Sequence, residues 1–464
     1  MKSRFRLLSI LVMVGLIGAL AAPAAFAGAG AEDIKNLYNG DNVIAHIQAL
    51  TDLGPRVAGG PVEKAAAEYI AGEMKSYGLA VEVQEFPIDY YQELATPVLD
   101  GYTPEVDFAT MSYSGSGDVT APVQAVDLML PPTGGSTSGC EAADFAGFVP
   151  GNIALMQRGT CNFSVKAANA EAAGAVGAII INEGNTPDRS GLLLGTLGGP
   201  GIGIPVVGTT FALGPELLAL GVPVHLMVST VSYASTSQNV IGTLAGTKPD
   251  QGIVYIGGHY DSVSAGVGAN DDASGTAGML EAARVLATNG HRTKATLKFI
   301  AFGAEETGLN GSFEYVNANF DEVSTKGLGM INLDMIGVGT ILQIGNIDYG
   351  VPGTGGNQLK DYTQAKATAM GVTWEPFVAG ENSDHTYFEQ VGVPAAFLFE
   401  SPDPYYHTSQ DTLDKITPAN LEQNGELATA VMYDWAKNPA LRAKKDAKGL
   451  LQVYVYQDKV AAGK

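Results

Sequence analysis

The chain has 464 residues, of which 46% are hydrophobic and 16% are charged, and this length suits two or three domains with sizeable cores. Acidic residues outnumber basic ones by 48 to 26, and the net charge of −22 argues against nucleic acid as a partner, since phosphate binding needs a basic surface. The 2 cysteines exclude a disulfide scaffold and any cysteine-rich zinc or iron–sulfur site.

The first 27 residues have the order of a secretory signal peptide. Three basic residues open the chain, an apolar run extends from Leu7 to Ala21, and Ala25-Phe26-Ala27 fits the small-x-small cleavage pattern. A membrane anchor is the alternative, but the run is shorter than the ~20 residues that span a bilayer. We therefore expect cleavage near Ala27 and a secreted, extracellular or periplasmic protein with no stable membrane anchor in its mature form.

The next region, residues 28–112, begins an α/β domain. Pro61 to Tyr77 has apolar residues three and four positions apart with charged residues between them, and Gly78 follows. This pattern predicts a helix that ends at the glycine. Val81 to Phe86 alternates between apolar and polar residues, which predicts a strand.

Residues 113–235 have a different sequence pattern, in which turn clusters rich in glycine and serine separate short apolar runs. Strands are predicted at 152–156, 175–182 and 204–209, and a helix at 164–173, so we expect a small β-rich domain inserted into the first one. Cys140 and Cys161 both lie in this insert. In an oxidising compartment we expect a disulfide between them, and two free buried thiols are the alternative.

The α/β pattern resumes over residues 236–440. Strands are predicted at 240–243, 253–259, 297–302, 329–335 and 395–399, with helices at 274–286 and 309–319. Strands that alternate with helices indicate a mixed, mostly parallel sheet covered by helices on both faces. Such a sheet binds its ligands at the carboxyl ends of its strands. The C-terminal tail, residues 441–464, is basic and is expected to be solvated surface.

Acids and histidines follow these predicted strands or lie in the adjacent loops: His259 and Asp261, Asp271 and Asp272, Glu305 and Glu306, Asp334, and His407. Imidazole and carboxylate are good zinc donors. Even if only three of these carboxylates bind metal, together with the two histidines they are too many for one tetrahedral ion with an open position. They are enough for two ions if one carboxylate bridges them.

Each motif also has a structural alternative. Of the Glu305-Glu306 pair, one carboxylate can bind metal while the other acts as a general base, but such a pair is usually a solvated turn. Asp261 can accept the second ring N–H of His259, as carboxylates behind metal-binding histidines do. Asp271-Asp272 can instead cap the following helix.

Six motifs resemble those of the co-catalytic di-zinc aminopeptidases, such as leucyl aminopeptidase and aminopeptidase Y. That family also includes glutamate carboxypeptidase, glutaminyl cyclase and the transferrin receptor. The motifs are His259–Val263, Ala269–Gly275, Phe302–Leu309, Asn332–Gly337, Ser383–His385 and Tyr406-His407. The insert is similar to a protease-associated domain at Gly151–Phe163 and in the segment that follows. The resemblance covers nearly the whole chain after the signal peptide.

The resemblance implies a zinc exopeptidase fold and two zinc ions per chain. Its pattern gives one zinc to His259 and Asp334 and the other to Glu306 and His407, with Asp271 bridging both. It implies a secreted aminopeptidase that hydrolyses N-terminal residues from peptides with a free amino terminus.

The same resemblance implies roles for five further residues. Glu305 would be the general base for a zinc-bound hydroxide, Asp261 would support His259, and Tyr406 would help to hold the oxyanion. Asn382 and Asp384 occupy the expected substrate-binding positions. Asn382 stands where some secreted relatives have an arginine near the terminal amine of the substrate.

Two other functions compete with this interpretation. A di-zinc carboxypeptidase or dipeptidase of the same family would read a terminal carboxylate with arginines, and the sequence is poor in arginine near these motifs. A non-catalytic, receptor-like binding protein is the second alternative, since the transferrin receptor has this architecture without the chemistry. Retention of every predicted ligand together with Glu305 favours the enzyme.

Overall fold

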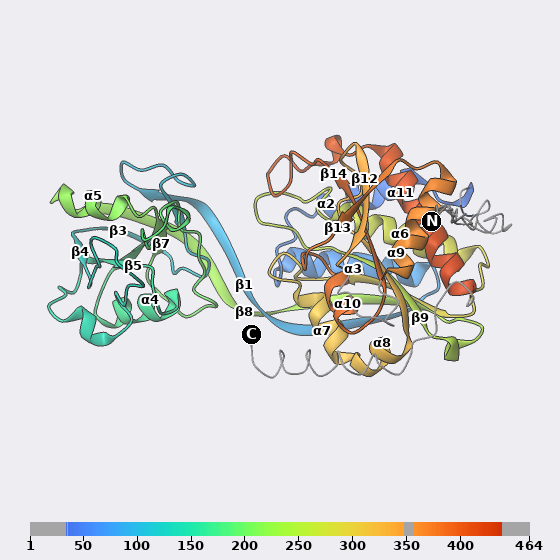
Figure 1. Cartoon of the computed structure of the whole chain (residues 1–464), viewed down its shortest axis with the longest axis horizontal. Helices are drawn as coiled ribbons and strands as arrows, with labels where there is room; N and C mark the ends of the chain where they lie inside the picture. Colours follow the sequence, from blue (N-terminus) through green and yellow to red (C-terminus); the bar gives the residue numbers. More distant parts are fainter. Residues whose placement is uncertain (1–33, 35, 348–356, 439–464) are drawn as a thin grey trace, which may run out of the picture.

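The computed structural model describes residues 34, 36–347 and 357–438, so the predicted signal peptide and C-terminal tail lie outside the described residues. The chain forms two lobes joined by a long two-stranded arm (Figure 1). The large lobe combines segments from both sides of the small lobe, which is built from the middle of the chain. None of the helices described is long and apolar enough to cross a membrane.

The large lobe is built on a mixed sheet with the strand order β1-β8-β10-β9-β11-β14-β12-β13, and β3 pairs with β8 beside this path. Four parallel strands form its centre: β10 (Thr296–Phe302), β9 (Ile253–His259), β11 (Gly327–Leu333) and β14 (Ala395–Ser401). β12 (Ile341–Asn346) and β13 (Trp374–Val378) extend the sheet beyond β14. This sheet confirms the predicted α/β class.

Helices cover both faces of the large sheet (Figure 1). One face carries α2 (Gly40–Thr51), α3 (Pro61–Ser76), α6 (Ala273–Thr288), α9 (Gln358–Met370) and α11 (Pro418–Lys437). The other face carries α7 (Asn310–Ala318), α8 (Phe320–Lys326) and α10 (His385–Gln390). Alternate residues of β9 point into the two cores, Val254 and Ile256 into the first and Ile253 and Tyr255 into the second. A strand buried on both faces has to be apolar throughout, which is why its sequence reads as a continuous run.

The small lobe holds a second sheet with the order β2-β7-β6-β5-β4. Its elements are β2 (Phe108–Thr110), β3 (Gly117–Ala121, paired with β8), β4 (Val123–Ala125), β5 (Ile153–Gln157), α4 (Phe163–Ala172), β6 (Gly177–Ile181), β7 (Val206–Thr209) and α5 (Leu213–Leu220). β2 pairs with β7, so the lobe begins before the boundary predicted at residue 113. β4, β5, β6 and β7 are mutually parallel, which gives this lobe an α/β character that its turn-rich sequence hides.

The arm consists of β1 (Ala80–Leu99) and β8 (Val224–Leu244), which pair antiparallel over nearly their whole length. The predicted strands at 81–86 and 240–243 cover only the ends that join the large sheet. Between the lobes the ribbon exposes many side chains on both faces, so its sequence lacks the alternation that marks a half-buried strand. Two register shifts interrupt the pairing between Glu93 and Val98.

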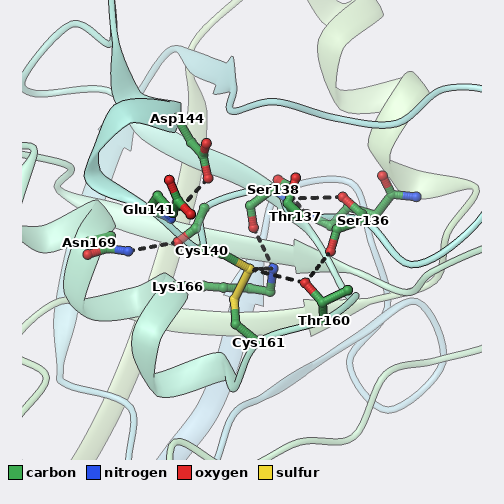
Figure 2. Close-up of a disulfide and its surroundings, with 12 residues drawn as sticks. Ser136, Thr137, Ser138, Cys140, Glu141, Asp144, Thr160, Cys161, Lys166 and Asn169 are labelled. Carbon is green, nitrogen blue, oxygen red and sulfur yellow. Dashed lines mark hydrogen bonds between the residues drawn. A yellow bond between two sulfur atoms is a disulfide. The ribbon is translucent and has the colours of Figure 1, made fainter.

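A disulfide joins Cys140 and Cys161, as predicted, and lies between the segment before α4 and the start of that helix (Figure 2). Beside it, the ammonium group of Lys166 is fully buried, donates a hydrogen bond to the Ser138 carbonyl and lies 3.5 Å from Cys140 Sγ. Burial lowers the pKa of Lys166 to about 8. The disulfide and this lysine together hold the loop that contains Ser138 and Cys140 against α4.

Removal of the disulfide is expected to destabilise the small lobe alone. A loop of 21 residues corresponds to roughly 3 kcal/mol of loop-closure entropy in the unfolded chain. Both tryptophans, Trp374 and Trp435, lie in the large lobe. In a variant with Cys140→Ala and Cys161→Ala, circular dichroism should therefore show an early melting transition that tryptophan fluorescence does not follow. Coincident transitions at the wild-type temperature would contradict this assignment.

Candidate metal centre

The predicted ligands come together at one edge of the large sheet. His259 is the last residue of β9, Glu305 and Glu306 follow β10, Asp334 follows β11, and His407 lies in the loop after β14. Because these four strands are parallel, their carboxyl ends meet at the same edge. The side chains line a cavity of about 360 Å³. Its other lining residues are Asp271, Met335, Phe377, Asn382, Phe397, Phe399, Asp403 and Tyr406.

Asp271 lies between the two histidines. Its Oδ1 is 3.1 Å from His259 Nε2, and its Oδ2 is 3.1 Å from His407 Nε2. His407 Nε2 is also 3.0 Å from Glu306 Oε2, and His259 Nε2 is 3.7 Å from Asp334 Oδ1. The five residues thus form two groups, each with one histidine and one carboxylate, that share Asp271.

The donor set fits divalent cations. Two imidazoles and three carboxylates converge on one cavity, and these are the nitrogen and oxygen ligands that zinc takes in proteins. Glu306 Oε1 is buried and has no hydrogen-bond partner among the described residues, although a buried carboxylate oxygen is costly to leave unpaired. His259 with Asp271 and Glu306 satisfies the geometry of a metal-binding group. The residues present therefore suit a divalent metal ion.

The electrostatics of the cluster point the same way. Burial raises the pKa of Glu306 to about 7 and that of Glu305 well above its ordinary value. Burial alone would lower the pKa of His407, but its hydrogen bonds with Asp271 and Glu306 raise it to about 10. The crowded carboxylates therefore draw in positive charge, which a bound dication would supply.

Asp261 supports both halves of the site. It is fully buried, and its Oδ1 lies 3.4 Å from His259 Nδ1. Its carboxylate also accepts hydrogen bonds from the backbone N–H groups of Glu305 (3.0 Å) and Glu306 (3.2 Å). One side chain thus fixes the turn that carries the two glutamates and lies beside the histidine ring.

Asp271 and Asp272 divide two tasks between them. Asp272 is the N-cap of α6, where its Oδ1 accepts hydrogen bonds from Gly275 N (2.7 Å) and Met335 N (3.0 Å). The capping alternative is therefore correct for Asp272, while Asp271 turns into the cavity. The peptide bond between them is cis.

Strained backbone accompanies the site. Ala304, Met335 and His407 have positive φ angles of 55°, 62° and 57°. Residues with a Cβ rarely adopt this region, and proteins retain such strain mainly at functional sites. Ala304 precedes Glu305, and Met335 follows Asp334, so in each case the unusual turn directs a neighbouring carboxylate into the cavity.

The sequence matches the model of Peptidase family M28 over residues 239–432 and that of the PA domain over residues 119–217. It is 38% identical over 438 residues to an aminopeptidase of Pseudomonas aeruginosa, covering 85% of this chain and 80% of that protein. It is 34% identical over 400 residues to aminopeptidase YwaD of Bacillus subtilis, covering 83% and 82%. This chain belongs to peptidase family M28. It is a metallo-aminopeptidase, and the small lobe is its PA domain.

Solved structures agree with this family. An aminopeptidase from Aneurinibacillus sp. strain AM-1 superimposes with a TM-score of 0.65 and 35% identity, covering 90% of this chain and 97% of that one. A structure described as a zinc aminopeptidase from Bacillus subtilis gives a TM-score of 0.64 and 32% identity, covering 88% and 97%.

Two positioning residues of this M28 enzyme were not found from the sequence. Arg56 is fully buried and donates hydrogen bonds to the carbonyls of Tyr260 (2.5 Å), Val267 and Gly268 (2.9 Å). It thereby pins the segments that follow His259 and precede Asp271. No local pattern marks Arg56, because its partners lie about two hundred positions away in the sequence.

Asp411 is the second residue that was missed. Its carboxylate accepts hydrogen bonds from Asn270 N (2.8 Å) and Asp271 N (3.0 Å). These two bonds fix the backbone of the residue that both histidines contact. No spacing or motif marks Asp411 in the sequence, since it follows His407 in an irregular loop.

The residues predicted to contact the substrate lie in different surroundings. Tyr406 is half-exposed in the cavity wall, and its ring stacks on His407 with centroids 3.8 Å apart. Asn382 is exposed and also lines the cavity. Asp384 is fully buried and is not among the lining residues, so we withdraw it as a substrate contact. Burial raises the pKa of Asp384 to about 7.

Replacement of Asp411 is expected to weaken metal retention. Asp411→Asn keeps the size of the side chain but turns an N–H group toward one of the two backbone donors. Loss of such support around ligands typically lowers metal affinity about 10- to 100-fold. The metal content after dialysis against graded chelator concentrations measures the change. Asp414→Asn, an exposed position in the short 3-10 helix that follows the loop of Asp411, is the matched control. Equal retention in the two variants would contradict the role of Asp411.

Proposed function

We propose that this M28 enzyme is a secreted di-zinc aminopeptidase that removes single residues from the amino termini of peptides. The observation that carries the proposal is the position of Asp271, whose two oxygens each lie 3.1 Å from a different histidine. A carboxylate so placed can be shared by two ions. The similarity to a zinc aminopeptidase of Bacillus subtilis supports zinc as the metal.

The proposed ligand sets follow the two groups around Asp271. His259 and Asp334 would hold one ion, Glu306 and His407 the other, and Asp271 both. A pair of zinc ions lowers the pKa of a bound water and polarises a carbonyl oxygen. Asp261 keeps His259 oriented for this task through the contact behind its ring.

Glu305 is the proposed general base. Its side chain lines the cavity, only 11% exposed, with Oε2 3.9 Å from His259 Nε2. The hydrogen bond from Glu305 N to Asp261 fixes its backbone, so the carboxylate is held near the reacting groups. Glu305 takes a proton from the attacking water and then delivers it to the leaving amine. Tyr406, in the wall beside His407, is placed to donate a hydrogen bond to the oxygen on which charge develops.

The lining of the cavity favours an aminopeptidase over a carboxypeptidase. Recognition of a terminal carboxylate needs a cationic partner, usually an arginine. Among the lining residues that the structure describes, none is a lysine or arginine, whereas several are acidic. Such a cavity suits the positive charge of a free amino terminus.

The disulfide supports the proposed location. Disulfides persist in oxidising compartments, and the predicted signal peptide would direct the chain to one.

Glu305→Gln is expected to lower kcat by about 10²- to 10⁴-fold, because the variant cannot accept the proton of the attacking water. Its metal content and melting temperature should remain those of the wild type, since the amide keeps the shape of the side chain. Glu375→Gln, exposed on the edge strand β13, is the control. Turnover near the wild-type rate with full metal content would remove Glu305 from the mechanism.

Metal removal and blocked substrates test the rest of the proposal. A chelator should abolish hydrolysis of aminoacyl-nitroanilides, and restoration by zinc should saturate at two ions per chain. A dipeptide with a blocked carboxyl terminus should be cleaved, and one with a blocked amino terminus should resist. The opposite pattern would identify a carboxypeptidase, and saturation at one ion would exclude the shared role of Asp271.

A further inference from the structure

The cavity wall away from the metal ligands is aromatic. Phe377 on β13 packs against Phe397 and Phe399 on β14, with ring centroids 5.5 and 5.4 Å apart. Phe397 and Phe399 point the same way because they are two positions apart on one strand. Met335 completes this apolar lining. The wall can pack against the aliphatic part of a long side chain.

Asp403 is the one lining acid that belongs neither to the five proposed ligands nor to the general base. It lies two residues beyond the end of β14 and is partly exposed. Its Oδ2 accepts a hydrogen bond from Asn270 Nδ2 (2.8 Å), and its Oδ1 accepts one from Tyr405 N (2.7 Å). The Asn270 side chain is itself fixed, since its Oδ1 accepts from Gly337 N and Val338 N. The Asp403 carboxylate is therefore held in place.

This fixed charge lacks a cationic partner among the described residues. Asp403 takes part in none of their ion pairs, and no lysine or arginine lines the cavity around it. An ionised carboxylate has about four acceptor positions, so two remain after its two hydrogen bonds. A held, uncompensated carboxylate in the same cavity as an aromatic wall is suited to a cation that arrives with the substrate.

We propose that Asp403 binds the cationic end of the side chain of the substrate's N-terminal residue, and that the enzyme therefore favours peptides beginning with lysine or arginine. This inference rests on the proposed aminopeptidase function. Lysine and arginine have aliphatic stems that pack on apolar surfaces while their charged ends reach a polar group. Here Phe377, Phe397 and Phe399 receive the stem and the carboxylate receives the charge.

The α-amino group of the substrate is the other cation to consider. It is separated from the scissile carbonyl by a single carbon, so it has to lie beside the metal cluster whatever the residue is. The side chain is the part of the substrate whose end can reach a carboxylate elsewhere in the cavity. The two sources also predict different results, because every substrate has the amine and only some have the cationic side chain.

The test compares lysyl- and norleucyl-nitroanilide, which share the same aliphatic chain and differ in the terminal ammonium group. The wild-type enzyme should prefer the lysyl substrate by about tenfold in kcat/KM, the usual effect of one hydrogen bond to a charged group. Asp403→Asn should remove this preference, chiefly through KM for the lysyl substrate. High salt should reduce it in the wild type. Asp414→Asn, an exposed acid in the short 3-10 helix after the loop of Asp403, should retain the wild-type ratio.

Three outcomes would overturn the proposal. A wild-type ratio near one would show that the cavity does not recognise the ammonium group, and this measurement needs no variant. Equal losses on both substrates in Asp403→Asn would mean that Asp403 binds the α-amine or only supports Asn270. A wild-type ratio retained in that variant would assign the preference to another group. Hydrolysis of neither substrate by the metal-loaded wild type would instead refute the aminopeptidase function on which the proposal rests.

Discussion

The structure depends on a concentration of buried negative charge at the edge of the large sheet. Asp261, Asp271, Glu305, Glu306 and Asp334 lie in or behind one cavity, and no more than 11% of any of their side chains is exposed. Like charges this close repel strongly unless cations accompany them. The chain supplies two histidines and the buried guanidinium of Arg56, and two divalent ions would supply the rest. Metal binding should therefore also stabilise the fold, since only the folded chain assembles the ligands.

Arg56 also explains why the short segment before the insert belongs to the peptidase lobe. Its guanidinium reaches three backbone carbonyls between Tyr260 and Gly268, and Ser262 N donates back to the Arg56 carbonyl. The PA domain separates these partners in sequence but not in space. It is inserted between β1 and β8, which leave the sheet together as a paired arm, so the register of the central strands is undisturbed (Figure 1). An insert at the far end of a ribbon leaves the loops of the site in place.

The sequence predicted those elements whose local residue pattern reflects their place in the fold. β9, β10 and β11 are mostly apolar runs with a histidine or an acid at the strand end or within three residues of it, so the strands could be predicted and the candidate ligands could be proposed from the sequence. β13 is a largely exposed edge strand, and the arm is exposed on two faces, so neither has a periodic pattern to detect. Arg56, Asp403 and Asp411 act through contacts with residues more than a hundred positions away, and local reasoning has no means to find such partners.

In the proposed mechanism, negative charge in the cavity contributes both to metal binding and to substrate selection. Once two dications are bound, their charge is largely offset by the proposed ligands, and Asp403 remains as a separate acid in the wall of the cavity. The whole chain has a net charge of −22, and the site acids contribute only a minority of its acidic residues. A negative field of this kind attracts cationic chain ends before any specific contact forms and weakens with ionic strength. Long-range attraction would therefore act on every amino terminus alike, and discrimination between them would have to come from short-range contacts such as those proposed for Asp403 and the aromatic wall.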